Sequence, residues 1–311
     1  RPLPISNFKK QSLLCFFSSV DYVILFMKRE LMINPKKALI VEGGGSRGVF
    51  SFGVIDSFIK ASYNPFDLHF GVSNGAVVQL WFLLAVTDYN LDKMLFSASK
   101  KYVSYKNIFF NKSIMNFTEL YKDANKIFPI DFIRLTEKLK DKNFYVVVSD
   151  AESGTSEYIE LDHDNYVDQL LATGSLPVLM REPILLDGLR KYDGGITDPL
   201  PVQKAYEYGA KDIVIIRTYE ETFIRKTKME NHIAAFFTKQ YPNLAHALKV
   251  NAATYNASLD FIKNPPADCR ITQICPPTRL TAKRATTDIK IMKKDYEIGL
   301  ACGAKYLSKK I

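Results

Sequence analysis

Cysteine and histidine are scarce in this chain of 311 residues, which has four of each. The cysteines form no C-x-x-C pair and no cluster with histidine, and this argues against a zinc site or a disulfide framework. So few histidines also argue against another kind of metal centre. We expect reduced cysteines that pack in the interior. They are Cys15, Cys269, Cys275 and Cys302.

The sequence also lacks a long uninterrupted apolar run. Leu13–Met27 comes nearest, but Asp21 interrupts it, it is too short to span a bilayer, and no small-residue cleavage site follows. We therefore expect residues 1–37 to be an N-terminal extension or a peripheral helix. The few cysteines and the missing signal favour a cytoplasmic or peripheral-membrane location, and export without a cleaved signal is equally compatible with them.

The charge balance is basic, with 42 Lys and Arg against 33 Asp and Glu, a net charge of +9. Such an excess indicates contact with an anionic surface, which phospholipid and nucleic acid both provide. No basic run is interleaved with stacking aromatics, so nucleic acid is not expected. With 47% hydrophobic residues, the chain can bury a full core as one large α/β domain, residues 38–311.

Two glycine-rich turns organise the first part of this domain. The first, Gly43–Gly48, follows a predicted buried strand at Ala38–Val41 and precedes a predicted helix at Val49–Ala61. It also satisfies the Gly-x-Gly-x-x-Gly pattern of dinucleotide binding. That alternative requires an acidic residue at the end of the second strand, whereas Asp67 precedes that strand.

The second turn, Gly71-Val72-Ser73-Asn74-Gly75, lies between an apolar strand and an apolar helix. A Gly-x-Ser-x-Gly turn in this position is typical of a nucleophile elbow, in which the serine hydroxyl is exposed on a strained turn and Gly71 and Gly75 permit close backbone approach. The same five-residue pattern also arises by chance in ordinary loops. The first turn precedes it by about 25 residues, so its backbone N–H groups could lie beside Ser73 and bind an oxyanion.

Further along, residues 88–142 have helical spacing and no recognisable chemistry, and we expect a helical insertion. Its lysines and aromatics could dock on a membrane or line an acyl pocket, or simply form a solvated face. Residues 220–311 are expected to be a basic, helical C-terminal part. Between these regions, strands alternate with helices, which predicts a mainly parallel central sheet with helices on both faces. The predicted strands are 144–148, 158–161, 184–186, 190–192 and 212–216.

Four ordered blocks resemble those of the patatin-like phospholipase family. The spacing and flanking strands match throughout residues 38–217, and the later likeness is weaker and is to a bacterial branch of the family. The blocks are Gly43–Gly48, Gly71–Gly75, Ala172–Pro177 and Asp193-Gly194-Gly195, followed by Tyr255-Asn256 and the stretch from Pro276 to Tyr306.

The resemblance implies a Ser-Asp dyad, with Ser73 as nucleophile and Asp193 as its base. A carboxylate can serve as base if it reaches the hydroxyl directly, and Gly194 and Gly195 would let the backbone bring it close. Considered alone, Asp193 is also typical of an ordinary turn beside glycines. The resemblance further implies an oxyanion and substrate site from the first turn, with backbone N–H groups of Gly44, Gly45 and Ser46 and electrostatic support from Arg47. The whole set is Gly43, Gly44, Gly45, Ser46, Arg47, Gly48 and Asn74.

One residue departs from the family pattern. The family usually has a small residue after the serine, and this chain has Asn74. Its N–H can still face an oxyanion, but its side chain narrows the space near the acyl carbon. The departure bears on substrate size more than on the reaction.

The expected activity is that of a lipid acyl hydrolase of the phospholipase A or lysophospholipase type. It acts through an acyl-enzyme, needs no metal or organic cofactor, and takes a phospholipid or another acyl-ester lipid, with peripheral contact to an anionic membrane surface. A Ser-His-Asp esterase is the first alternative, because His232 and His246 follow Asp193 in the required order, although both lie in a helical stretch.

The second alternative is a non-catalytic lipid-binding module on the same scaffold. A binding module has no need to retain both Ser73 and Asp193, which argues against it. Basic residues near the C-terminus would suit contact with anionic headgroups under either interpretation, or form an ordinary solvated face. They are Arg279, Lys283, Arg284, Lys290, Lys293 and Lys294.

Overall fold

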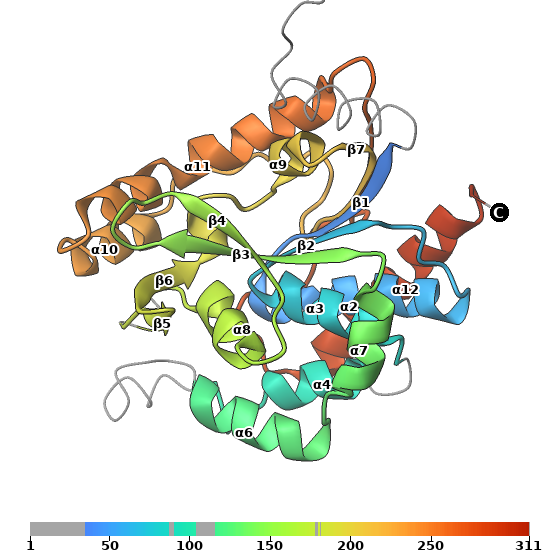
Figure 1. Cartoon of the computed structure of the whole chain (residues 1–311), viewed down its shortest axis with the longest axis horizontal. Coiled ribbons are helices and arrows are strands. Elements are labelled where there is room, and N and C mark those ends of the chain that lie inside the picture. The colour runs from blue at the N-terminus through green and yellow to red at the C-terminus, as the bar shows by residue number, and fades with distance from the viewer. Residues whose placement is uncertain (1–34, 87–89, 104–115, 178–179, 181, 311) are drawn as a thin grey trace, which may run out of the picture. The chain divides into compact units, whose positions relative to one another are not determined.

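The computed structural model describes residues 35–310 except 87–89, 104–115, 178–179 and 181 (Figure 1). The expected extension at residues 1–37 therefore lies almost entirely outside the described part. The strands are β1 (Lys36–Val41), β2 (Leu68–Val72), β3 (Asn143–Asp150), β4 (Ser156–Glu160), β5 (Ile184–Leu186), β6 (Leu189–Asp193), β7 (Ala210–Ile216) and β8 (Arg270–Ile274). The helices are α2 (Gly48–Lys60), α3 (Asn74–Leu84), α4 (Asn90–Ser97), α6 (Phe117–Ile127), α7 (Phe132–Leu139), α8 (Tyr166–Gly174), α9 (Val202–Glu207), α10 (Met229–Phe237), α11 (Pro242–Lys263) and α12 (Ile289–Leu307), with two 3-10 turns, η1 (Gly45–Arg47) and η2 (Gly194–Ile196).

These eight strands form one mixed sheet in the order β5-β6-β3-β2-β1-β7-β8, with β4 also paired to β3. The neighbours β3-β2, β2-β1, β1-β7 and β7-β8 are parallel, whereas the pairings of β3 with β4 and β6, and of β5 with β6, are antiparallel. The mainly parallel α/β architecture predicted from the sequence is therefore correct.

Both faces of the sheet are covered, because the central strands are apolar on each side. Along β1, Leu39 and Val41 pack into one hydrophobic cluster with α2, α3 and α12, while Ala38 and Ile40 pack into a second cluster with α9 and α11. Figure 1 shows these two helical layers on opposite sides of the sheet.

The parallel register brings the two glycine turns together. In β1 and β2, Val41 pairs with Gly71, so both strands end at the same edge of the sheet. The turn at Gly43–Gly48 and the turn containing Ser73 start directly beyond these ends. Polar groups and helix N-termini commonly gather at the carboxyl ends of parallel strands. This edge is therefore the expected place for a functional site.

The C-terminal part, expected to be basic and helical, contains helices α10, α11 and α12 and also one strand. Between α11 and α12 it contributes β8, which extends the sheet by pairing in parallel with β7. The strand has only five residues, with little of the apolar run that marks a buried strand, so periodicity did not predict it. Among the described residues, no helix has the length and apolar character needed to cross a membrane.

Candidate active site

Ser73 lies in a strained turn between β2 and α3. Its backbone has φ 55° and ψ −132°, a region that residues with side chains rarely adopt. Two contacts hold the turn: the Ser73 N–H donates to Thr173 Oγ1 at 2.8 Å, and Thr173 donates in turn to the Val147 carbonyl at 2.6 Å. Gly71 and Gly75 flank the serine where a Cβ would collide with Ala76 and with the Val41 carbonyl, respectively. This is the geometry of a nucleophile elbow.

The strain predicts an unusual order of stability for two variants that both lack the hydroxyl. Ser73→Gly should be more stable than Ser73→Ala by about 1–2 kcal/mol, since only glycine relieves a backbone cost of about 1–3 kcal/mol. Urea unfolding measures the difference. The exposed helical residue Glu137 is the control, where alanine should exceed glycine by about 1 kcal/mol. An alanine variant as stable as Ser73→Gly would contradict the strain.

Asp193 ends β6 and is 2% exposed. Gly195 N–H donates to its Oδ1 at 2.7 Å, Ser149 Oγ donates to its carbonyl at 2.8 Å, and its own N–H donates to the Ser175 carbonyl at 3.0 Å. Burial raises the pKa of Asp193 to about 6, and hydrogen bonding from Ser73 partly opposes this increase. The carboxylate and the Ser73 hydroxyl are thus brought together from elements 120 positions apart. Asp193 has the properties of a general base near neutral pH.

The first glycine turn lies directly against Ser73. A Cβ at Gly43 would be 2.7 Å from the Ser73 Cβ, so only glycine allows this approach. The next residue, Gly44, precedes η1, and Gly45 has φ 56°. The N–H of Ser46 was expected to be an oxyanion donor, but it donates to the Arg284 carbonyl at 2.9 Å. Gly44 and Gly45 therefore remain as the candidate donors.

Asn74 and Arg47 both line the candidate site. Asn74 Nδ2 donates to the Gly45 carbonyl at 3.0 Å and is the group that a Cβ on Gly48 would meet at 2.0 Å, so this side chain supports the glycine turn. Arg47 lies over the Tyr219 ring, 4.5 Å from its centroid. Burial lowers the pKa of Arg47 from its ordinary value, although Tyr219 and Glu42 oppose the decrease.

A cavity of about 240 Å³ opens at the dyad. Ser73, Asp193 and Gly43–Gly45 line one part of it, together with Arg47, Arg225 and Arg284. The remaining wall is mainly apolar and includes residues of α4, α6 and α8 that belong to or follow the predicted insertion. Helices α2 and α3 also contribute to this wall. Its apolar residues include Phe52, Leu80, Trp81, Met94, Phe128 and Leu170. Such a cavity suits a fatty-acyl chain whose ester lies at Ser73.

None of the four histidines lines this cavity. His232 and His246 are exposed on α10 and α11, and His163 is exposed beside Asp164. His69 is fully buried, its Nδ1 lies 2.9 Å from Gln79 Oε1, and burial lowers its pKa to about 4. The arrangement therefore offers no imidazole to Ser73.

A family model described as patatin-like phospholipase matches residues 39–206, more than half of the chain. The chain belongs to the patatin-like phospholipase family. A second model, a domain of unknown function, matches residues 241–310. The first match spans both glycine turns and Asp193, and the second spans α11, β8 and α12.

Two sequence relatives and one solved structure illustrate the range of similarity to this patatin-like chain. YjjU, an uncharacterised protein of Escherichia coli (strain K12), is 27% identical over 275 residues, covering 87% of this chain and 77% of YjjU. Lysophospholipase NTE1 of Scheffersomyces stipitis is 23% identical over 294 residues, covering 89% of this chain and 18% of NTE1. The crystal structure of VipD from Legionella pneumophila aligns with a TM-score of 0.45 and 13% identity, over 89% of this chain and 67% of VipD.

Several residues of this patatin-like site carried no signal in the sequence. Thr173 lies within the third block, but nothing in that block indicated its bond to Ser73. Arg225 and Asn251 are an isolated basic residue and a helical amide, and neither belongs to a recognised motif. Arg284 was grouped with basic residues that would either contact headgroups or form a solvated face, whereas its guanidinium donates to Glu230 at 2.7 Å and lines the cavity.

Proposed function

We propose that this protein is a lipid acyl hydrolase that cleaves fatty-acyl esters through Ser73 and Asp193. The observation that carries the proposal is the position of a strained serine beside a buried carboxylate with a raised pKa, at one end of an apolar cavity. Membership of the patatin-like phospholipase family and the NTE1 lysophospholipases among its relatives support a lipid ester as substrate.

The reaction proceeds in two halves. Asp193 accepts the proton of the Ser73 hydroxyl as Ser73 Oγ attacks the ester carbonyl. The oxyanion that forms accepts hydrogen bonds from the N–H groups of Gly44 and Gly45. Collapse breaks the bond to the alcohol, which leaves with the proton from Asp193. Water then gives a proton to Asp193 and attacks the acyl-enzyme, and the fatty acid departs as Ser73 regains its hydrogen.

The cavity wall favours a chain over a compact acyl group. Each methylene removed from water contributes about 0.8 kcal/mol, and the residues from α4, α6 and α8 provide the surface that accepts it. Three arginines lie beside the dyad, and two of them are paired with acids, Arg225 with Glu42 and Arg284 with Glu230. The remaining positive charge suits a lipid headgroup or an anionic membrane surface. We therefore place the acyl chain against the apolar wall and the headgroup toward Arg47, Arg225 and Arg284.

Hydrolysis of a medium-chain p-nitrophenyl ester and of mixed phospholipid vesicles tests the proposal against the histidine alternative. On each substrate, the double variant His232→Ala/His246→Ala should have the same rate as wild type, because neither histidine lines the cavity. Loss of activity in the histidine variant would instead indicate a Ser-His-Asp esterase. A folded wild type that binds vesicles and turns over neither substrate would favour the lipid-binding module.

A further inference from the structure

The C-terminal region that matches a domain of unknown function is built into the edge of the fold that holds the catalytic residues. Its strand β8 extends the sheet, and its helix α12 packs closely along α2, the helix that follows the glycine turn. At the crossing of these helices, Gly299 leaves room for the Phe50 carbonyl, and Gly53 for the carbonyl of Tyr296. The region therefore shares its packing with the catalytic part.

Asn251 on α11 connects this region to the turn that carries the base. Its side chain is 7% exposed, and its Nδ2 donates to the Gly195 carbonyl at 2.7 Å and to the Ile196 carbonyl at 2.8 Å. Gly195 is the same residue whose N–H donates to Asp193 Oδ1. Asn251 thus holds the carbonyl of Gly195, and the N–H of Gly195 orients the Asp193 carboxylate.

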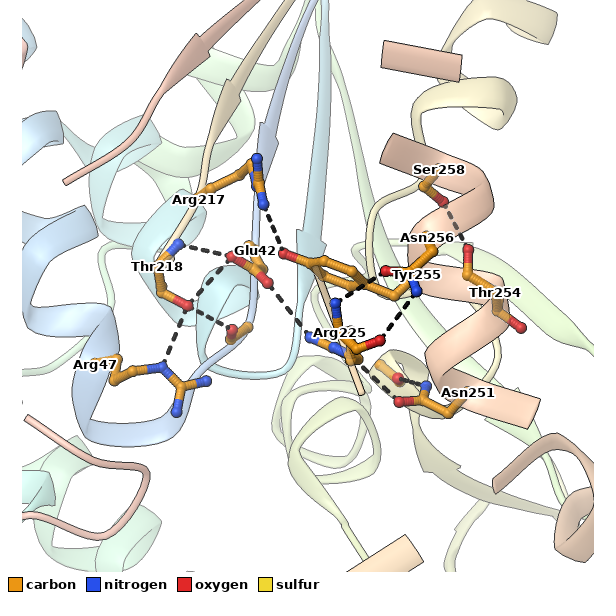
Figure 2. Close-up of polar contacts among 12 residues, drawn as sticks. Glu42, Arg47, Arg217, Thr218, Arg225, Asn251, Thr254, Tyr255, Asn256 and Ser258 are labelled. Atoms are coloured by element: carbon orange, nitrogen blue, oxygen red, sulfur yellow. Dashed lines mark hydrogen bonds and ion pairs between the residues drawn. The ribbon is translucent and has the colours of Figure 1, made fainter. Parts of the chain in front are cut away.

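Arg225 continues the connection (Figure 2). Its Nη1 donates to Asn251 Oδ1 at 3.2 Å, and its guanidinium lies over the Tyr255 ring, 3.7 Å from the centroid. The side chain of Asn256 holds the Arg225 backbone at both polar groups, accepting from its N–H at 2.9 Å and donating to its carbonyl at 3.0 Å. Three residues within two turns of α11 therefore fix Arg225.

Glu42 completes the connection at the glycine turn. It is 1% exposed, and its Oε1 lies 3.5 Å from Arg225 Nη2. Its Oε2 accepts from the Thr218 N–H at 2.6 Å, and the Thr218 hydroxyl lies 3.3 Å from the Gly43 carbonyl (Figure 2). Because Glu42 directly precedes Gly43, its position constrains where the candidate oxyanion turn begins.

The C-terminal region also contacts the glycine turn directly, through Arg284. The Arg284 carbonyl accepts from the Ser46 N–H at 2.9 Å, and a Cβ at Gly45 would lie 2.3 Å from that carbonyl oxygen. The C-terminal region thus holds both the turn after Asp193 and the turn before Ser73. These two parts of the site come from strands β6 and β1, which β3 and β2 separate in the sheet.

We propose that Asn251, Arg225 and Glu42 form a polar brace that sets the position of Asp193 relative to the oxyanion turn, and that holding this brace is a function of the C-terminal region. The three are positioning residues for the reaction, and the inference rests on the proposed acyl hydrolase function. Asn251 is hydrogen-bonded to Arg225, and Arg225 forms an ion pair with the buried Glu42. Buried polar groups connected in this way restrict a site to one arrangement.

Two variants of Asn251 and one matched control test the brace. Asn251→Asp keeps an acceptor for Arg225 but has no donor for the Gly195 and Ile196 carbonyls, and Asn251→Leu removes both functions. The control is Asn243→Leu on the same helix, because the Asn243 amide also donates to a backbone carbonyl, that of Glu152 at 2.9 Å, outside the cavity lining. Each protein is assayed on the p-nitrophenyl ester below its own melting temperature, as measured by circular dichroism.

The brace predicts a fall in kcat of about 10²-fold in both Asn251 variants, with KM close to that of wild type, because misplaced catalytic groups affect the chemical step rather than acyl binding. The control should keep the wild-type kcat. If the Asn251 variants have the same kcat as the control, or if only their KM is raised, the brace is wrong and the proposed function is unaffected. A wild type and a control that are both inactive would overturn the proposed function, and the brace with it.

Discussion

Ser73→Ala is expected to lower kcat for acyl-ester hydrolysis on the order of 10⁴- to 10⁶-fold, since the variant has no nucleophile with which to form the acyl-enzyme. The loss should appear in kcat with KM nearly unchanged, because the apolar wall that binds the chain is intact. Steady-state hydrolysis of the p-nitrophenyl ester measures both constants.

Ser51→Ala is a matched control for this loss. Ser51 lies on α2, is fully buried and does not line the cavity, whereas Ser73 is half-buried and lines it. Its variant should keep the wild-type kcat. A Ser73→Ala protein that retains a substantial part of the wild-type rate would show that another group performs the attack, and the assignment of the elbow as the catalytic centre would be wrong.

Asp193→Asn is expected to lower kcat on the order of 10⁴-fold, because an amide cannot accept the Ser73 proton. In wild type, kcat/KM should fall as the pH decreases through about 6, where the buried carboxylate becomes protonated. The pH profile of the p-nitrophenyl ester reaction measures this limb. A rate that stays constant from pH 8 to pH 5 would contradict a carboxylate base with this pKa.

The same substitution should change stability in the opposite direction. Burial raises the pKa of Asp193 from 3.8 to about 6, so the folded state binds this proton more tightly than the unfolded state. The contribution to stability is therefore complete below about pH 4 and is lost as the pH rises through 6. At pH 8, Asp193→Asn should be more stable than wild type by about 1–3 kcal/mol, and at pH 4 the difference should vanish. Urea unfolding at the two pH values measures it.

The sequence was sufficient to predict the central sheet and the two turns. Ala38–Val41 and Leu68–Phe70 are short, mainly apolar runs, each followed within two residues by a glycine-rich turn and then by a helical stretch, and this order is typical of a buried strand. The hairpin with Asp187-Gly188 at its turn was also predictable, since both residues have positive φ, as such a turn requires. Local chemistry and periodicity determine these features.

The groups that support the site could not be predicted in the same way. Thr173 bonds to a residue 100 positions away, and Asn251 to carbonyls 56 and 55 positions away. Each is one polar side chain in an otherwise ordinary helix, where its type is compatible with a solvated position as well as with a buried bond. Arrangement in space, rather than local pattern, gives these residues their roles. The hydrogen bond from the Ser46 N–H to the Arg284 carbonyl could not be predicted for the same reason.

The most direct test of the account is the site and rate of labelling by an alkyl fluorophosphonate, a reagent that forms a covalent adduct with an activated serine. Intact mass and peptide mapping should find one adduct, on Ser73, in wild type. Labelling should be absent in Ser73→Ala and strongly slowed in Asp193→Asn, because the dyad activates this hydroxyl. An adduct on another serine, or labelling of Asp193→Asn at the wild-type rate, would contradict a catalytic Ser73-Asp193 dyad.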